Sequence, residues 1–161
     1  MNIRLYNARI LTMEPGREVF YGEIWVKNDK IAYVAEQKEL AEEWDRSQFP
    51  RIAWDIELDC KGNLLMPGFK NAHTHSGMTF LRSMADDMPL DQWLNKQVFP
   101  LEAKLTGEDI YDLTRLAVLE YLTSGVISIF DMYLTPDTIA EACLDTGMRC
   151  AVSYTHLTLP T

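Results

Sequence analysis

Cysteine and positive charge are both scarce in this sequence. Three cysteines occur in 161 residues, Cys60, Cys143 and Cys150, and none belongs to a Cys-x-x-Cys motif. An odd number without that spacing does not indicate a disulfide framework, so we expect a reduced, cytoplasmic protein with small buried cysteines. The 15 Lys and Arg residues are outnumbered by 24 Asp and Glu, for a net charge of -9. This balance argues against nucleic acid or an anionic membrane surface as a partner.

Long hydrophobic runs are absent as well. The amino-terminal segment MNIRLYNARILTM contains Arg4 and Arg9 and lacks the apolar stretch of a signal peptide or a membrane anchor. The composition, 47% hydrophobic and 24% charged, is that of a soluble globular protein long enough to bury a sizeable core. These properties exclude classes of partner but indicate no substrate.

Residues 1–65 are rich in short β-branched and aromatic segments, which predict strands. The predicted strands lie within residues 4–13, 22–36 and 53–58. The polar residues 27–30 predict a hairpin turn inside the second segment. The charged residues 41–48 predict one or two helical turns. The amino-terminal part is therefore expected to be a small β domain.

Beyond a predicted turn at residues 59–63, the pattern changes to alternating strands and helices. An apolar run broken by Pro-Gly occupies residues 64–75, and helical periodicity begins at Asp91. Further strands are predicted at residues 126–133 and from residue 148 onward. This order predicts a parallel α/β sheet or barrel.

Two helices are predicted between these strands. Five apolar residues of the first helix share one face: Ile110, Leu113, Leu116, Ala117 and Tyr121. Thr106 is the expected N-cap of this helix, and Gly125 is its expected end. The second helix has Thr135 as its expected cap, Pro136 at its first position and Gly147 after its last residue.

His73 and His75 carry the chemistry that the sequence predicts. Alternate residues of a strand point to the same face, so both imidazoles would project from one side at the end of the apolar run. Two imidazoles make half of a catalytic zinc site, in which one position stays open for water. In a parallel barrel, such residues at the carboxyl end of a strand lie where active sites are found. A bare His-x-His pair also occurs by chance, so the surrounding residues decide between the two interpretations.

Those surrounding residues, GNLLMPGFKNAHTHSGMTFLRSMADDMPLDQWL, resemble the opening of the barrel in the amidohydrolase superfamily, where a Pro-Gly turn leads into a first strand ending in a His-x-His metal pair. Over residues 3–151 the sequence is similar to the 5-methylthioadenosine / S-adenosylhomocysteine deaminases and their chlorohydrolase-like relatives. The resemblance implies an α/β fold. Residues 1–65 would be part of a small β-sandwich domain, and residues 66–151 would be the first strands and helices of a truncated, metal-dependent (β/α)8 TIM barrel.

The resemblance also implies site residues. His73 and His75 would be two ligands of one catalytic divalent metal, Zn2+. Trp93 would wall the pocket of a nucleoside substrate, and Glu102 would accept hydrogen bonds from its ribose hydroxyls. Judged on the residues alone, Trp93 is as well explained as a core residue and Glu102 as a solvated helix residue. Asp131, at the end of a predicted strand, we interpret as structural or as supporting the site rather than as catalytic.

Two residues depart from the family pattern. Lys70 stands where relatives usually have an apolar residue, and alternation would point it toward the helices, where its ammonium must reach solvent or a carboxylate. Ser83 stands where relatives often have glycine. Lys70 bears on the packing around the strand and not on the histidines beside it.

The implied function is metal-dependent hydrolysis of a carbon–nitrogen bond other than a peptide bond. The reaction would be hydrolytic deamination of an adenosine-like nucleoside such as methylthioadenosine or S-adenosylhomocysteine. Guanine or cytosine deamination and triazine dechlorination are the enzymatic alternatives, and Glu102 favours a nucleoside because a free base has no ribose. In relatives the remaining metal ligands and the acid/base residues follow in later strands, so no catalytic residue is predicted here. A second interpretation is therefore that this chain is an inactive fragment of such an enzyme.

Residues 152–161, VSYTHLTLPT, do not continue the alternation of helices and strands. The peptide resembles the translated read-through of a transposase-based sequencing adapter. We therefore expect the natural sequence to end near Ala151 and interpret the tail as an assembly artefact, which excludes His156 as a metal ligand. Sequencing of the source locus tests this expectation, since genomic DNA that encodes the tail would refute it.

Overall fold

The structure is a computed structural model that describes residues 1–37, 52–84 and 87–153. The chain divides into two compact units, Met1–Pro67 and Gly68–Thr161. The helical turns predicted at residues 41–48 lie outside the described residues, as does His156. No helix in the described part of the chain is long and apolar enough to cross a membrane.

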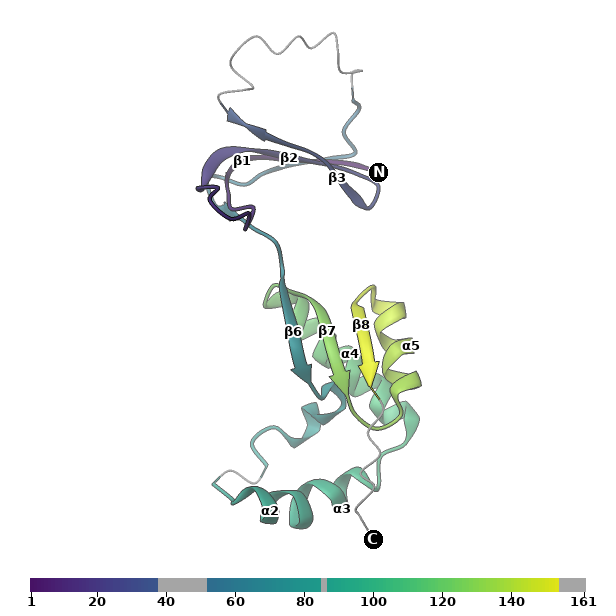
Figure 1. Ribbon diagram of the computed structural model, residues 1–161. Helices are drawn as coiled ribbons and strands as arrows, with labels where there is room; N and C mark the ends of the chain where they lie inside the picture. The colour runs from purple at the N-terminus through teal and green to yellow at the C-terminus, as the bar shows by residue number, and fades with distance from the viewer. Residues whose placement is uncertain (38–51, 85–86, 154–161) are drawn as a thin grey trace. The chain divides into compact units, whose positions relative to one another are not determined.

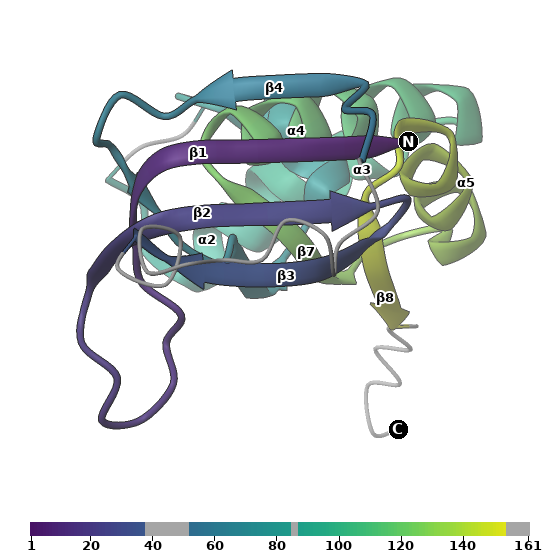
Figure 2. The ribbon, with the colours of Figure 1, turned by 90° about the horizontal axis from the view of Figure 1, so that it is seen from above.

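The first unit contains one five-stranded sheet. Its strands are β1 (Asn2–Ile10), β2 (Phe20–Lys27), β3 (Lys30–Glu36), β4 (Ile56–Asp59) and β5 (Leu64–Leu65). The order is β3-β2-β1-β4, with antiparallel pairing of β1 to β2 and of β2 to β3 (Figure 2). Both β4 and β5 pair with β1 in parallel. The predicted hairpin is confirmed, because β2 and β3 are joined by two residues, of which Asn28 has the left-handed φ of 59°.

Two strands of this unit are shorter than predicted. Strand β1 stops at Ile10, and the left-handed φ of 65° at Met13 interrupts the extended backbone soon afterwards. Strand β4 begins at Ile56 rather than at residue 53. Before that point, Asn2 donates from its backbone N–H to the Asp55 carboxylate at 2.6 Å and from Nδ2 to the Ala53 carbonyl at 3.1 Å. Beside these side-chain contacts, the Asp55 backbone N–H donates to the Asn2 carbonyl at 2.9 Å.

The core of the first unit is small and contains one buried carboxylate. Its fully buried apolar residues are Ala8, Ile10 and Ala35. Glu23 is buried beside them and accepts hydrogen bonds from Arg4, through Nε at 2.9 Å and Nη2 at 2.6 Å, and from Trp25 Nε1 at 2.7 Å. A buried carboxylate with this many charge-assisted and neutral donors is satisfied, so Glu23 has a structural role.

The second unit is a three-stranded parallel sheet covered by helices. Its strands are β6 (Phe69–Thr74), β7 (Val126–Met132) and β8 (Arg149–Ser153), in the order β6-β7-β8 (Figure 1). Helix α4 (Gly107–Thr123) connects toward β7, and helix α5 (Pro136–Thr146) connects β7 to β8. The predicted alternation of parallel strands and helices is confirmed. Strand β8 also includes Val152 and Ser153, the first two residues of the segment interpreted as a tail.

The predicted N-cap is confirmed for α4 but only in part for α5. Thr106 caps α4 as predicted: its hydroxyl accepts from the Asp109 backbone N–H at 3.2 Å, and the Asp109 carboxylate accepts from the Thr106 backbone N–H at 2.8 Å. Thr135 precedes α5 as predicted, but its side chain makes no capping hydrogen bond. Its backbone is left-handed, with φ 47° and ψ 64°, which is outside the extended conformation that N-cap residues adopt.

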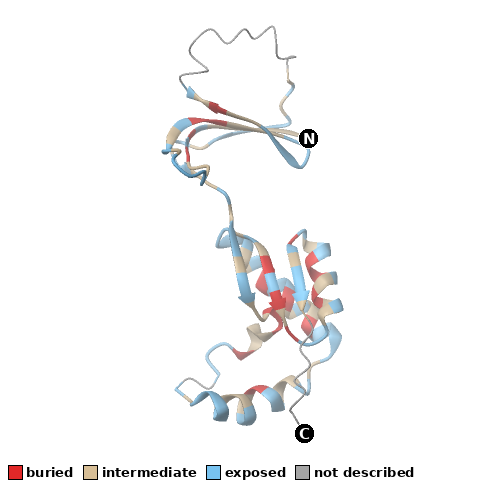
Figure 3. Ribbon diagram, viewed as in Figure 1, coloured by how far each residue is buried: buried red, intermediate tan, exposed pale blue. Residues whose placement is uncertain are grey.

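The core of the second unit lies between the sheet and its helices. Seven buried residues form it: Ile110, Val118, Ile129, Tyr133, Ile139, Cys143 and Met148. Figure 3 shows this burial concentrated on β7 and the facing sides of α4 and α5. The predicted apolar face of α4 is partly wrong, because Leu116 is 46% exposed whereas Val118 is buried.

An irregular helical segment separates β6 from α4. It consists of the 3-10 helix η1 (Ser76–Leu81), α2 (Leu90–Trp93), the π-helical stretch η2 (Leu94–Val98) and α3 (Phe99–Glu102). The helical character predicted from Asp91 onward is confirmed. Leu105, just after this segment, and Met78 of η1 pack against the core of the second unit.

Candidate metal centre

His73 and His75 meet at the carboxyl end of β6. His73 belongs to the strand, whereas His75 is the residue directly before η1, with φ -134° and ψ 74°. Their Nε2 atoms lie 3.1 Å apart, and their ring planes are inclined by 85°. The expectation that one strand runs through both residues is wrong by one residue, since β6 ends at Thr74. The Nε2 atoms of the two rings nevertheless lie next to each other.

His75 is oriented through its second ring nitrogen. Its Nδ1 lies 2.5 Å from the carbonyl oxygen of Met132, the last residue of β7. A carbonyl oxygen can only accept, so Nδ1 carries the proton of this bond. In the neutral imidazole, Nε2 then keeps a free lone pair on the side of His73. Metal-binding histidines are oriented in this way by a hydrogen bond from their other nitrogen.

The geometry of the two Nε2 atoms fits a single divalent cation. Nitrogens that are each about 2.0–2.1 Å from a tetrahedral zinc ion lie roughly 3.3 Å apart, close to the separation found here. Without an ion, the same distance is that of a hydrogen bond between the two rings. Within the three described ranges, no group of three or more His, Cys, Asp or Glu residues could hold a metal. His73 and His75 are therefore the two described residues that could hold such a cation.

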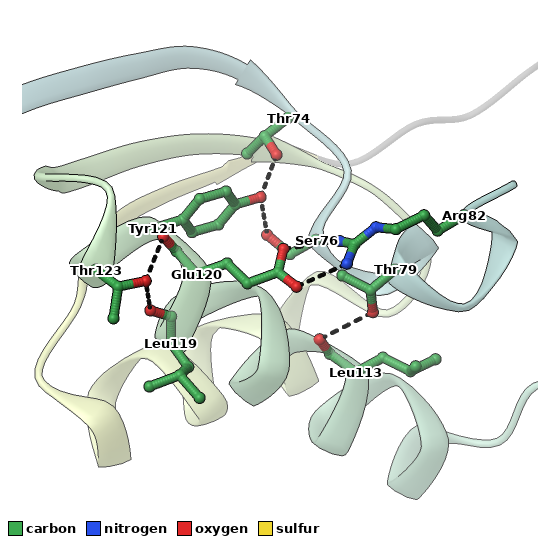
Figure 4. A network of polar contacts seen from close by, with 9 residues as sticks. All are labelled: Thr74, Ser76, Thr79, Arg82, Leu113, Leu119, Glu120, Tyr121 and Thr123. Carbon is green, nitrogen blue, oxygen red and sulfur yellow. Dashed lines mark hydrogen bonds and ion pairs between the residues drawn. The ribbon is translucent and has the colours of Figure 1, made fainter.

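The residues on both sides of His75 are bonded to helix α4. The Tyr121 hydroxyl contacts the Thr74 hydroxyl and lies 3.2 Å from the Ser76 hydroxyl (Figure 4). Neither Tyr121 nor Ser76 was singled out from the sequence as part of a site. The sequence indicates Tyr121 as a residue of the apolar helix face and nothing more. The signal that could have identified it is its hydroxyl, which needs a hydrogen-bond partner on a buried face.

Asp131 is fully buried beside the same turn. Its Oδ2 accepts from the Ser76 backbone N–H at 2.9 Å and from the Ser76 hydroxyl, whereas its Oδ1 has no partner among the described residues. Burial raises the pKa of Asp131, and the bonds from Ser76 and the proximity of His75 oppose that rise. Asp131 is thus connected to His75 in two ways. It bonds to Ser76, the residue after His75, and it directly precedes Met132, whose carbonyl accepts from the His75 ring.

The two predicted substrate-binding residues lie on the segment between β6 and α4. Trp93 ends α2 and is half-buried, and Glu102 ends α3. Glu102 lies near Tyr133, the residue after β7: burial raises the pKa of the Tyr133 phenol, and the Glu102 carboxylate raises it further. The Tyr133 hydroxyl is buried, and no hydrogen bond of ordinary geometry joins it to another described residue. Glu102 is therefore associated with the same edge of the sheet as the histidines.

The two departures from the family pattern have different structural settings. Lys70 is exposed, so its ammonium reaches solvent without crossing the core. Ser83 has a left-handed φ of 59°, a region that glycine occupies without steric cost. The position of Ser83 therefore explains physically why glycine suits this site, whereas Lys70 does not disturb the packing around β6.

Similar proteins cover nearly all of this chain. A 5-methylthioadenosine/S-adenosylhomocysteine deaminase from Caldicellulosiruptor saccharolyticus is 37% identical over 153 residues, which are 95% of this chain and 34% of that protein. A 5'-deoxyadenosine deaminase from Methanococcoides burtonii is 38% identical over 154 residues, 95% of this chain and 33% of that protein. The chain thus spans about one third of the length of the curated relatives it matches.

Solved structures with the same fold include metal-containing ones. The crystal structure of an adenosine deaminase from Xanthomonas campestris with bound zinc matches with a TM-score of 0.79 and 30% identity, over 92% of this chain and 32% of that one. An atrazine chlorohydrolase from Arthrobacter aurescens complexed with zinc matches with a TM-score of 0.79 and 19% identity, over 98% of this chain and 36% of that one. The model of the amidohydrolase family matches residues 64–160. This chain, with its facing histidine pair at the end of β6, belongs to the amidohydrolase family.

Proposed function

We propose that the protein is a metal-dependent hydrolase that deaminates adenosine-like nucleosides such as methylthioadenosine or S-adenosylhomocysteine. The observation that carries the proposal is the pair of facing Nε2 atoms, with His75 oriented by the Met132 carbonyl. The names of the two relatives support the substrate class, since each describes a deaminase of an adenosine derivative. Water adds to the ring carbon that bears the exocyclic amine, and that amine leaves as ammonia.

In this proposal His73 and His75 hold one divalent cation, Zn2+. When bound, the cation supplies the Lewis acidity that activates water at neutral pH. His75 contributes a fixed lone pair because its Nδ1–H donates to Met132. No residue of this chain is assigned as the general acid or base. The zinc in the Xanthomonas structure supports the choice of metal.

Trp93 and Glu102 are proposed to bind the substrate. Trp93 would present its half-buried indole to the purine or to the 5' substituent. Glu102 would accept hydrogen bonds from both ribose hydroxyls, which a carboxylate can do with its two oxygens. The proximity of Glu102 to Tyr133, directly after β7, supports this role because it associates the carboxylate with the edge that carries the histidines.

We also propose that the two units belong to a (β/α)8 barrel and a β-sandwich. Strands β6, β7 and β8, with α4 and α5, would be the first three strands and the intervening helices of a (β/α)8 barrel. The five-stranded sheet of the first unit would be part of a β-sandwich. Parallel order and the position of the histidines at the carboxyl end of β6 support the barrel.

The test is ammonia release by the polypeptide expressed from the source locus, loaded with zinc. We expect turnover of methylthioadenosine and S-adenosylhomocysteine, with slower release from guanine or cytosine and no chloride release from a chlorotriazine. The 161-residue chain is assayed beside it, and with two described ligands we expect it to be inactive. Turnover of guanine but not of either nucleoside would refute the substrate class. Failure with every substrate at full zinc occupancy would refute the deaminase.

A further inference from the structure

Tyr121 bridges the two residues that flank His75. Its hydroxyl contacts Thr74 on one side and Ser76 on the other, although Tyr121 comes from the last turns of α4 (Figure 4). The bridge therefore fastens the end of β6 and the start of η1 to the same atom. His75, between these two anchored residues, has little freedom to change its backbone direction.

The protons of this network have one consistent arrangement. Oδ2 of Asp131, as a carboxylate oxygen, accepts from both the backbone N–H and the hydroxyl of Ser76. The Ser76 oxygen, having donated its proton to Asp131, accepts from the Tyr121 hydroxyl. The Tyr121 oxygen in turn accepts from Thr74. Each of the three hydroxyls thus donates once, those of Ser76 and Tyr121 also accept once, and the bonds run in one direction toward the carboxylate.

Asp131 adds a second connection through the backbone. It is followed by Met132, whose carbonyl accepts from Nδ1 of His75 at 2.5 Å. The carboxylate therefore fixes Ser76 while its neighbour in β7 fixes the imidazole itself. Asp131 and Ser76 are both buried, with 0% and 1% exposure, so water does not compete for these bonds.

We propose that Tyr121 and Asp131 are positioning residues for His75: by bonding to Thr74 and Ser76 they hold the turn that directs the His75 imidazole toward His73. The inference concerns which residues orient the ring, and it rests on the proposed function because the oriented ring is one of the proposed metal ligands. Neither residue is proposed as a metal ligand. Their contribution is to keep Nδ1 of His75 on the Met132 carbonyl and Nε2 on the side of His73.

The test uses Tyr121→Phe and Asp131→Ala in the polypeptide expressed from the source locus. Asp131→Asn is the conservative variant, because its amide oxygen still accepts from the Ser76 N–H. Tyr111→Phe is the matched control: Tyr111 lies on the same helix and donates to Asp145 at 2.7 Å, far along the helix from Tyr121. All four substitutions remove or alter a polar group without adding volume.

The first measurement is made on metal-free protein by NMR of the His75 imidazole. In the unmodified protein we expect a slowly exchanging Nδ1–H signal. Tyr121→Phe and Asp131→Ala should broaden it or speed its exchange at least tenfold, Asp131→Asn should recover most of the protection, and Tyr111→Phe should leave it unchanged. An unchanged Nδ1–H signal in both Tyr121→Phe and Asp131→Ala overturns the proposal, whatever happens to thermal stability.

The second measurement is the affinity for Co2+, read from its visible absorption. Loss of an orienting contact typically weakens metal binding about 10- to 100-fold, which is the effect expected for Tyr121→Phe and Asp131→Ala. Tyr111→Phe should bind Co2+ like the unmodified protein. If the unmodified protein binds no Co2+, the proposed metal site fails, but the NMR result still decides whether the two residues orient His75. If Asp131→Ala does not fold, Tyr121→Phe alone decides.

Discussion

Gly77 lies against the ring of Tyr133: a β-carbon on Gly77 would come within 2.3 Å of Cε1 and 2.5 Å of Cδ1 of that ring. The two residues follow the carboxyl ends of neighbouring strands, two residues after His75 and one after Met132. Tyr133 is 6% exposed and belongs to the core of the second unit. The absence of a side chain at Gly77 is therefore what allows η1 to approach the end of β7.

Gly77→Ala should destabilise the protein because the buried Tyr133 ring would have to move. Overpacking of this kind costs about 1–3 kcal/mol of the free energy of unfolding, measured by urea denaturation. Gly107→Ala is the control, since its added carbon would meet nothing closer than the Thr138 hydroxyl at 3.7 Å. We expect the control to be neutral or slightly stabilising at the start of α4. Equal stability of the two variants would contradict the close approach.

Substitution of either His73 or His75 by alanine should remove the metal. Because two ligands act as one unit, each single variant and the double variant should retain nearly the same small amount of zinc, measured by elemental analysis after gel filtration. Lys70→Ala is the control on the same strand, with an exposed side chain outside the site. Zinc content near that of the unmodified protein in either histidine variant would rule out the proposed centre.

Glu102→Gln should impair turnover of nucleosides selectively. A carboxylate that accepts from two ribose hydroxyls loses charge-assisted bonds when it becomes an amide, and about 10- to 100-fold of kcat/KM should be lost. Activity on the free base of the same purine should change little, because it has no ribose. The check is the ratio of kcat/KM for methylthioadenosine to that for adenine. An unchanged ratio would return Glu102 to a structural role beside Tyr133.

The capping box of α4 should make stability depend on pH. The Thr106 backbone N–H and hydroxyl donate to the Asp109 carboxylate and lower its pKa below the usual value. A carboxylate whose pKa is lower in the folded than in the unfolded state stabilises the fold fully at pH values above the unfolded pKa, about 3.9. This stabilisation is lost as the pH falls through the folded pKa. Asp109→Asn should therefore lower the urea midpoint at pH 7, and the difference from the unmodified protein should shrink toward pH 3.

A second variant and a control test the same capping interaction. Thr106→Ala removes the same cap from its other side and should cost about 1 kcal/mol at pH 7. Asp112→Asn is the control on the same helix, because its carboxylate lies 3.7 Å from Arg115 and caps no backbone group. A pH-independent difference for Asp109→Asn would mean that the cap does not depend on the charge of the carboxylate.

The fold of the second unit was largely predictable because its signals are local. Thr106, Gly125, Pro136 and Gly147 mark helix ends by their own backbone chemistry, and each lies where the sequence predicts. The facing of His73 and His75 was predictable from their spacing. Leu116 was misjudged because periodicity selects a face of a helix but not how far the neighbouring elements cover it.

The rest of the site depends on contacts between distant residues. Ser76 and Asp131 are 55 residues apart, and Thr74 and Tyr121 are 47 apart. No local pattern indicates which serine or which tyrosine closes such a network. The start of β4 was misplaced for a related reason, since the bonds of Asn2 to Ala53 and Asp55 span more than 50 residues. Sequence periodicity defines elements, whereas these contacts require their three-dimensional pairing.

The π-helical stretch between Trp93 and Glu102 changes the phase of the helix that carries both residues. On an unbroken α-helix, nine residues correspond to about two and a half turns, so the two side chains would point in opposite directions. A π-turn contains more residues and rotates less per residue, which turns the two directions toward each other. The stretch therefore acts as a one-residue insertion in the helical register, and deleting one residue between 94 and 98 would restore an unbroken α-helix that keeps this relative direction of the two side chains.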